Sequence, residues 1–364
     1  MRLFRFLPIL ALLPALHAEP AKMAFLRTQD NGLQTLSAEY KSPDGKGPSV
    51  WLIGVAHLGA REYYDAIQKR LDSKTTVLFE GVGGDKLTSG EKAQPGLQTQ
   101  LANALGLLFQ LDAIDYKRPN FVNSDLTIDK LNDAVGKRSA ATAAIVEAEK
   151  KQIAPESKSD SLKPAPSGAS AKPLQKVDNE TFTSLMDAIR GEGELAESLG
   201  GMIGMMGSTP EMRETTKLML VEALGQAGEI IDIAKAASPE LKDMFEVLLT
   251  ERNAEVLRQL DAQIAKLKTG QSVAVFFGAA HMDEIAERLT VQLHYTPVKQ
   301  EWDTAFKADA SKSIMAPAQI KMMIQMLRSQ LSNPDAAGAD AGGSLFNLLG
   351  PSADPKLQPP APKK

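Results

Sequence analysis

The chain has 364 residues, with 41 lysines and arginines against 45 aspartates and glutamates, and a formal net charge of −4. This balance lacks the basic excess that is typical of nucleic-acid-binding proteins, so we expect no nucleic-acid partner. The chain contains no cysteine, which excludes disulfides, thiolate metal ligands and cysteine nucleophiles.

Three segments have compositions that argue against packing in a core. Residues 1–18 combine two arginines with an apolar run and a small residue, the pattern of a secretory signal peptide. Residues 333–364 and about 138–176 are rich in small residues and proline, typical of a disordered tail and a low-complexity insertion. We therefore expect a secreted or periplasmic protein, in which residues 19–332 form one domain and no later apolar run spans a membrane.

The first predicted elements are strands. An Asn-Gly pair separates residues 23–28 from residues 33–40, which predicts an N-terminal β-hairpin. Residues 49–53 form a continuous apolar run, typical of a strand that is covered on both faces. An amphipathic pattern over 61–71 and another apolar run over 75–79 then predict a helix and a strand. This order indicates a parallel crossover.

The second half of the sequence is predicted to be mainly helical. Amphipathic patterns cover residues 98–111 and much of 179–268, with Thr209-Pro210 and Ser238-Pro239 as expected helix starts. Residues 272–277 predict another buried strand. The fold class is therefore α/β, with α+β as the alternative. We expect a mixed or mostly parallel central sheet, the N-terminal hairpin and a large helical insertion.

Two distant segments share one pattern: an apolar strand, then a GxxH sequence, then an amphipathic helix. The first histidine is His57 and the second is His281. In an open parallel sheet the functional crevice lies beyond the carboxyl ends of the strands, so we expect both imidazoles there. Glu80 directly follows a third predicted strand and should reach the same edge of the sheet.

Two imidazoles and a carboxylate are a ligand set that suits several divalent metals, among them Mn, Co and Zn. An ion held by His57, Glu80 and His281 could acidify a bound water and deliver it as a nucleophile. The alternative is that each histidine only hydrogen-bonds to a backbone carbonyl. The matched pair of GxxH strand ends, together with Glu80, favours the metal site.

The paired GxxH segments and the strand-end glutamate resemble the TraB/PrgY/GumN family, which is related to the Tiki proteases. Arg252 and Asn253 resemble the Arg-Asn element of that family. The resemblance implies a fold shared with erythromycin esterase and ChaN-like proteins, and a metal-dependent, metalloprotease-like hydrolase activity that some relatives have. It implies catalytic roles for His57, Glu80, His281, Arg252 and Asn253, with the two histidines and Glu80 holding the metal.

Arg252 is a candidate for orienting a carboxylate or stabilising developing negative charge, and Asn253 for orienting the substrate or Glu80. An ordinary salt bridge and a helix-bending contact are the alternatives. Tyr116 and Asp125 flank a loop and could extend the pocket, but turn and capping structure is favoured for them.

The sequence thus predicts a secreted or periplasmic metal-dependent hydrolase, with a peptide or an envelope-associated molecule as its substrate. The alternative is a noncatalytic binding or regulatory protein of the cell envelope, including an accessory role in polysaccharide production. The oligomeric state stays open.

Overall fold

The computed structural model describes residues 23–81, 96–127, 129–131, 133–138, 193–228, 232, 242–243 and 245–332. The predicted signal peptide, nearly all of the predicted insertion, the predicted tail and the Ser238-Pro239 helix start lie outside these residues.

The elements follow the chain in a regular order. The strands are β1 (Leu26–Gln29), β2 (Gly32–Lys41), β3 (Ser49–Val55), β4 (Leu58–Gly59), β5 (Thr76–Phe79), β6 (Leu108–Phe109), β7 (Phe121–Asn123), β8 (Ser272–Gly278) and β9 (Thr296–Lys307). The α-helices are α1 (Arg61–Asp72), α2 (Leu97–Leu105), α3 (Gln110–Ala113), α6 (Gly193–Met206), α7 (Pro210–Gly225), α10 (Arg252–Lys266), α11 (Met282–Glu287) and α12 (Pro317–Ser332). A 3-10 turn, η3 (Ala279–His281), and two π-helical turns, η2 (Glu246–Glu251) and η4 (Arg288–Gln292), extend them.

A mixed sheet of seven strands forms the centre of the described structure. Its order is β1-β2-β3-β8-β5-β7, and β9 pairs with the other edge of β2. Strands β3, β8, β5 and β7 are parallel, whereas β1, β2 and β9 pair antiparallel. The predicted α/β class is confirmed. Because β8 inserts between β3 and β5, the two GxxH segments follow neighbouring strands.

The predicted N-terminal hairpin is also confirmed. Asp30 and Asn31 join β1 to β2 with φ values of 51° and 56°, and a two-residue turn with both φ values positive matches the twist of the paired strands. Strand β2 continues beyond this hairpin and pairs with β3 through residues 37–40. Strand β2 thereby joins the hairpin and the parallel strands in one continuous sheet.

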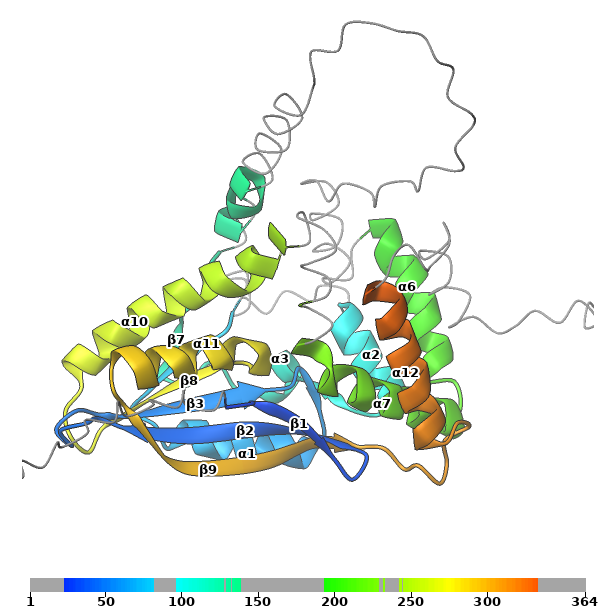
Figure 1. Ribbon diagram of the computed structural model, residues 1–364, viewed down its shortest axis with the longest axis horizontal. Coiled ribbons are helices and arrows are strands. Elements are labelled where there is room, and N and C mark those ends of the chain that lie inside the picture. Colours follow the sequence, from blue (N-terminus) through cyan, green and yellow to red (C-terminus); the bar gives the residue numbers. More distant parts are fainter. Residues whose placement is uncertain are drawn as a thin grey trace, which may run out of the picture.

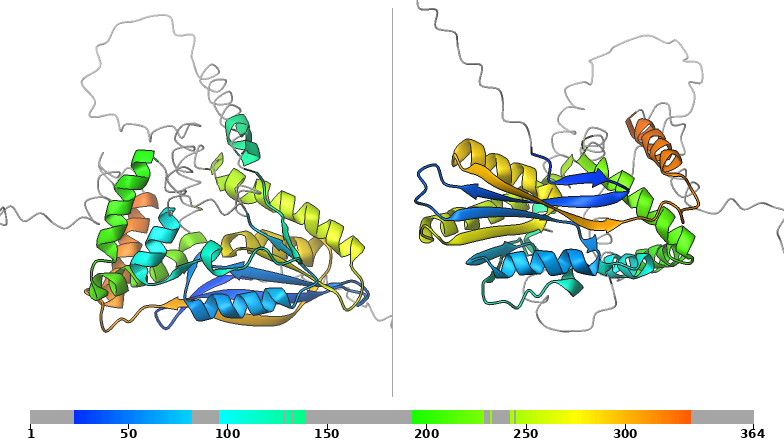
Figure 2. Two further views of the ribbon diagram at one scale, coloured as in Figure 1. Left: turned by 180° about the vertical axis from the view of Figure 1, so that it is seen from behind. Right: turned by 90° about the horizontal axis from the view of Figure 1, so that it is seen from below.

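Helices cover both faces of the parallel strands (Figures 1 and 2). Trp51 and Ile53 of β3 belong to the core on the α1 face, with Tyr64 and Ile67 of α1. Val50 and Leu52 of the same strand belong to the core on the opposite face, where α10 and α11 pack. Alternate residues of one strand thus enter different cores, which explains why its sequence is continuously apolar.

Helices α2, α6, α7 and α12 gather at one end of the molecule (Figure 1). Thr209 caps α7 as predicted, since its side chain accepts a hydrogen bond from the Met212 N–H. Helix α2 is shorter than the predicted 98–111, because Gly106 adopts a left-handed φ of 65° and ends it. None of the helices in the described ranges is long and apolar enough to cross a membrane.

Candidate active site at the carboxyl ends of the parallel strands

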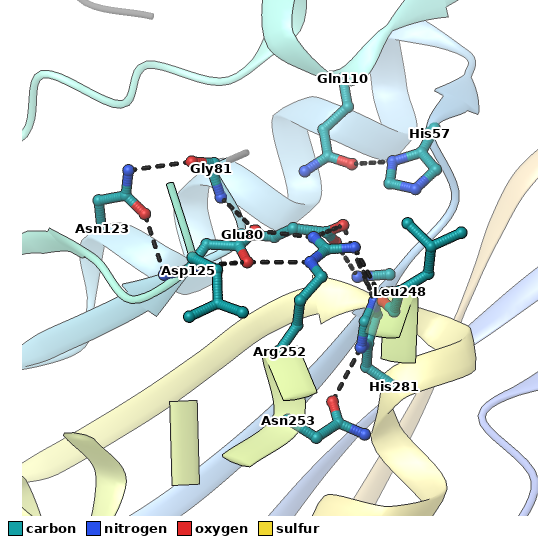
Figure 3. Close-up of polar contacts among 12 residues, drawn as sticks. His57, Glu80, Gly81, Gln110, Asn123, Asp125, Leu248, Arg252, Asn253 and His281 are labelled. Atoms are coloured by element: carbon teal, nitrogen blue, oxygen red, sulfur yellow. Dashed lines mark hydrogen bonds and ion pairs between the residues drawn. The ribbon is translucent and has the colours of Figure 1, made fainter. Parts of the chain in front are cut away.

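The structure brings all five residues predicted for the site together (Figure 3): polar contacts join Glu80, Arg252, Asn253 and His281, whereas His57 bonds to Gln110 beside them. His57, Glu80 and His281 follow β3, β5 and β8, which are neighbours in the sheet. Arg252 and Asn253 begin α10, which covers the same edge. The sequence positions of the strand ends therefore predicted correctly that His57, Glu80 and His281 lie at one edge of the sheet.

The glycines of the two GxxH segments make different close approaches. A Cβ atom on Gly54 would lie 3.4 Å from the Cα atom of Ala279, so this glycine lets β3 approach the η3 turn. A Cβ atom on Gly278 would lie 3.3 Å from Glu80 Oε2 and 3.4 Å from His57 Nε2. The absence of a side chain at Gly278 therefore keeps a small space between a carboxylate and an imidazole.

Glu80 presents its two oxygens to different partners. Oε1 accepts a hydrogen bond from Arg252 Nη2 at 2.5 Å and lies 3.9 Å from His281 Nε2. Oε2 accepts one from the Gly278 N–H at 2.7 Å. Burial alone would raise the pKa of this carboxyl, but electrostatic attraction from the Arg252 guanidinium and the neighbouring His281 and His57 rings, together with the Gly278 bond, lowers it well below its usual range. Glu80 is therefore an anion at neutral pH.

Arg252 is the centre of the network and is only 6% exposed. Its Nε and Nη2 donate to both oxygens of Asp125, at 2.9 and 2.7 Å, and Nη2 also donates to Glu80. Its Nη1 donates to the Leu248 carbonyl at 3.2 Å and to His281 Nε2 at 3.4 Å. These contacts use all five N–H donors of a guanidinium group. Arg252 can therefore orient its neighbours but has no donor left for a substrate.

Asp125 belongs to the site more closely than the sequence indicated. Its side chain is fully buried, and besides Arg252 it accepts hydrogen bonds from the backbone N–H groups of Gly81 and Leu126. The turn and capping role favoured for Asp125 is therefore incomplete. Strand β7, which the sequence did not predict, ends two residues earlier; an acidic residue just after a strand was the signal that could have found it.

His281 is buried and held at both ring nitrogens. Asn253 Nδ2 donates to Glu284 Oε2 at 2.6 Å, and because a carboxylate only accepts, the amide oxygen of Asn253 must face His281 Nδ1, 2.8 Å away. The proton of His281 is therefore on Nδ1, and Nε2 accepts from Arg252. Burial, opposed by Glu80 and supported by Arg252, lowers the pKa of His281 to about 4. Asn253 thus orients His281 rather than Glu80.

His57 is the exposed member of the set. Its Nδ1 lies 2.9 Å from Gln110 Oε1, and its backbone carbonyl accepts from the Gln110 N–H at 2.9 Å. Gln110 Nε2 in turn donates to the Tyr116 hydroxyl at 2.8 Å. Tyr116 therefore does extend the site, through Gln110, a residue for which the sequence gave no signal.

Two buried tyrosines of α1 fix the peptide that precedes His57. The Ala56 N–H donates to the Tyr63 hydroxyl at 3.1 Å, and the Tyr64 hydroxyl donates to the Ala56 carbonyl at 2.9 Å. Both backbone polar groups of Ala56 are thus held by side chains from a neighbouring helix. The backbone can position the His57 imidazole while the ring itself stays accessible.

We name two parts of the site by these contacts. The buried half consists of Arg252, Asp125, Asn253 and His281, which face Glu80 Oε1. The exposed half, named for the exposed His57 ring that it holds, consists of His57, Gln110, Tyr116 and Gly278, on the side of Glu80 Oε2. One guanidinium pairs two carboxylates and His281 is neutral, so the buried charges sum to about one negative charge beside His57.

The predicted three-ligand metal site does not fit the side chains as they lie. Over the described residues, no group of three or more histidine, aspartate or glutamate side chains is arranged to hold an ion. The reason is that the Arg252 guanidinium donates to both Glu80 Oε1 and His281 Nε2, so two of the three predicted ligands already face a cation. Metal binding by His57, Glu80 and His281 stays a prediction.

No family model, no curated protein and no solved structure matches the chain. The resemblance to the TraB/PrgY/GumN family therefore rests on the GxxH segments, Glu80 and the Arg-Asn pair alone.

Proposed function

We propose that this chain is a hydrolase in which His57 activates a water molecule next to Glu80. One observation carries the proposal: an exposed imidazole and an ionised carboxylate border the same small space above Gly278. The imidazole Nε2 has no hydrogen-bond partner among the described residues, whereas Nδ1 is engaged by Gln110. A basic nitrogen with an open approach is what a general base requires.

The proposed chemistry uses side chains of the chain itself. His57 Nε2 takes a proton from water while the water oxygen forms a bond to the carbonyl carbon of an amide or ester. The imidazolium that forms lies beside the negative charge of Glu80, which favours it electrostatically. His57 then returns the proton to the leaving nitrogen or oxygen as the carbon–heteroatom bond breaks.

The buried half supports this step without touching the substrate. Arg252 keeps Glu80 ionised and fixes its Oε1, and the Gly278 N–H fixes Oε2. His281 and Asn253 complete the packing around Arg252. Holding a catalytic carboxylate with buried charge-assisted hydrogen bonds gives an oriented charge that need not reorganise during the reaction.

The resemblance to the TraB/PrgY/GumN family supports a hydrolase of this general kind, and the signal-peptide pattern of residues 1–18 supports a secreted or periplasmic location. A peptide or an envelope-associated molecule remains our proposed substrate. A divalent ion remains part of the proposal only as a prediction, since the donor set would have to rearrange around Arg252 to supply three ligands.

The first test is a hydrolysis screen with peptide and ester substrates, comparing the wild type with His57→Ala. A matched control is His294→Asn, which changes another exposed histidine outside the site; His294 has a φ of 55°, a conformation that asparagine tolerates. We expect His57→Ala to lose hydrolysis and His294→Asn to keep it. Equal activity of all three proteins would contradict the proposal and favour a noncatalytic binding role.

The second test is elemental analysis after separate exposure to Mn, Co and Zn. Stoichiometric metal in the wild type that is lost in His57→Ala and in Glu80→Gln would establish the metal-dependent form of the mechanism. Hydrolysis that continues in the presence of chelators, in a protein without stoichiometric metal, would establish the form of the mechanism in which His57 alone activates the water.

A further inference from the structure

We propose that Gln110 is a positioning residue that holds His57 in the tautomer with its proton on Nδ1, leaving Nε2 unprotonated. The inference rests on the proposed role of His57 as a base, and it names the residue that makes the exposed nitrogen the basic one. Without such a partner a neutral histidine can place its proton on either ring nitrogen.

Gln110 and His57 contact each other at two points. The Gln110 N–H donates to the His57 carbonyl at 2.9 Å, and the Gln110 Oε1 atom lies 2.9 Å from His57 Nδ1. Both contacts follow from the local fold: Leu58–Gly59 forms β4 directly after His57, and it pairs with β6, which ends at the residue before Gln110. The short two-stranded sheet therefore sets these two residues side by side.

The Gln110 side chain lies in the direction this role requires. Gln110 is only 2% exposed, so water does not compete for its amide. Its Nε2 donates to the Tyr116 hydroxyl at 2.8 Å, and its Oε1 faces His57 Nδ1. The reversed amide would present N–H to Nδ1 and force the imidazole proton to Nε2, where it would block the proposed base.

Tyr116 is itself held in place by an aromatic cluster. Its ring centroid lies 4.9 Å from that of Phe79, 6.0 Å from that of Phe121 and 6.4 Å from that of Phe276. These phenylalanines belong to β5, β7 and β8. The central sheet thus positions the hydroxyl that accepts from the Gln110 amide, and the amide oxygen beside His57 Nδ1 favours the tautomer with the proton on that nitrogen.

The test is ¹⁵N NMR of the histidine-labelled chain at a pH well above the ordinary imidazole pKa of about 6.5, with His57 assigned by its loss in His57→Ala. We expect a protonated Nδ1 and an unprotonated Nε2 in the wild type. Gln110→Glu keeps an acceptor at the same place and should keep this tautomer. Gln110→Met removes the acceptor with little change in size and should give a mixture of tautomers.

Two further variants separate orientation from packing. Tyr116→Phe keeps the aromatic cluster but removes the hydroxyl to which Gln110 Nε2 donates. The Gln110 amide can then turn, and a population with the proton on His57 Nε2 should appear. If Gln110→Met does not fold, Tyr116→Phe provides the test. Tyr64→Phe removes a buried hydroxyl that bonds to the Ala56 carbonyl and not to the side chain of Gln110 or His57. It should therefore leave the tautomer of His57 unchanged. A proton on Nε2 in the wild type, or an unchanged Nδ1 tautomer in both Gln110→Met and Tyr116→Phe, would overturn the inference.

The same variants distinguish this inference from the proposed function. If hydrolysis proceeds through His57, kcat should fall in Gln110→Met and be restored in Gln110→Glu, with little change in KM. If the NMR result is as expected but His57→Ala retains its activity, the proposed function fails while the tautomer assignment stands. The two hypotheses can therefore fail separately.

Discussion

The buried half and the exposed half of the site share Glu80 but satisfy their polar groups in different ways. In the buried half each guanidinium donor and both His281 nitrogens have protein partners. In the exposed half, His57 is held by one ring nitrogen and by its backbone while Nε2 is left open. The difference indicates that complete pairing serves position and stability, whereas the one open nitrogen serves chemistry. Four predictions test this division.

The largest expected effect is on stability, from Arg252→Met. The substitution leaves the buried carboxylates of Glu80 and Asp125 without their cation, and breaking a buried ion pair costs about 3–5 kcal/mol. The free energy of unfolding from urea titration should fall by this amount. Arg252→Lys keeps the positive charge but lacks the planar set of N–H donors, so its free energy of unfolding should fall less. A loss below about 1 kcal/mol in Arg252→Met would contradict the assigned role.

The second prediction separates activity from stability. His57→Ala should leave the free energy of unfolding within about 0.5 kcal/mol of the wild type, because exposed side chains contribute little. It should lower hydrolysis by about 10²–10⁴-fold, the range of a general base. His281→Ala should instead destabilise the fold by removing a buried, hydrogen-bonded ring. Similar stability losses in both variants would erase the distinction between the halves.

The third prediction is a pH dependence of stability that comes from His281. Its pKa is about 4 in the folded protein and about 6.5 when unfolded, so between these values the unfolded chain binds a proton that the folded chain does not. The free energy of unfolding should therefore fall by about 2–3 kcal/mol as the pH drops from about 6.5 to about 4. Urea titrations at several pH values should show that the dependence of the free energy of unfolding on pH is reduced in His281→Gln and kept in His294→Asn.

The smallest effects are expected from the two GxxH glycines. Gly54→Ala presses a Cβ against backbone atoms, including the Cα of Ala279, and should cost about 1–3 kcal/mol of stability. Gly278→Ala meets only the ends of two side chains, Glu80 and His57, so it should cost less stability but lower hydrolysis by narrowing the space between them. Thermal denaturation and activity measured on both variants check the contrast, which fails if Gly278→Ala is fully active.

Local signals explain why much of the fold could be predicted. The Asn-Gly signal located the hairpin, although the two turn residues with positive φ values are Asp30 and Asn31 and Gly32 already pairs in β2. Strands β3, β5 and β8 follow from continuous apolar runs, since helices cover both faces of the sheet. Strand β7 was not predicted because its three residues, shortly after Pro119, are too few to show a hydrophobic pattern. Helix α2 was predicted too long because periodicity does not register a left-handed glycine.

The sequence by itself determined which residues stand at strand ends: two histidines after GxxH glycines and a glutamate after a buried strand. Only the tertiary structure decided how they are paired. Arg252 reaches Glu80 and Asp125 across 172 and 127 residues, and it lies between Glu80 and His281, where the sequence had predicted a shared metal ligand set. Gln110 reaches the His57 ring across 53 residues. Burial and hydrogen-bond partners arise from such long-range contacts, so residue types and spacing cannot assign them.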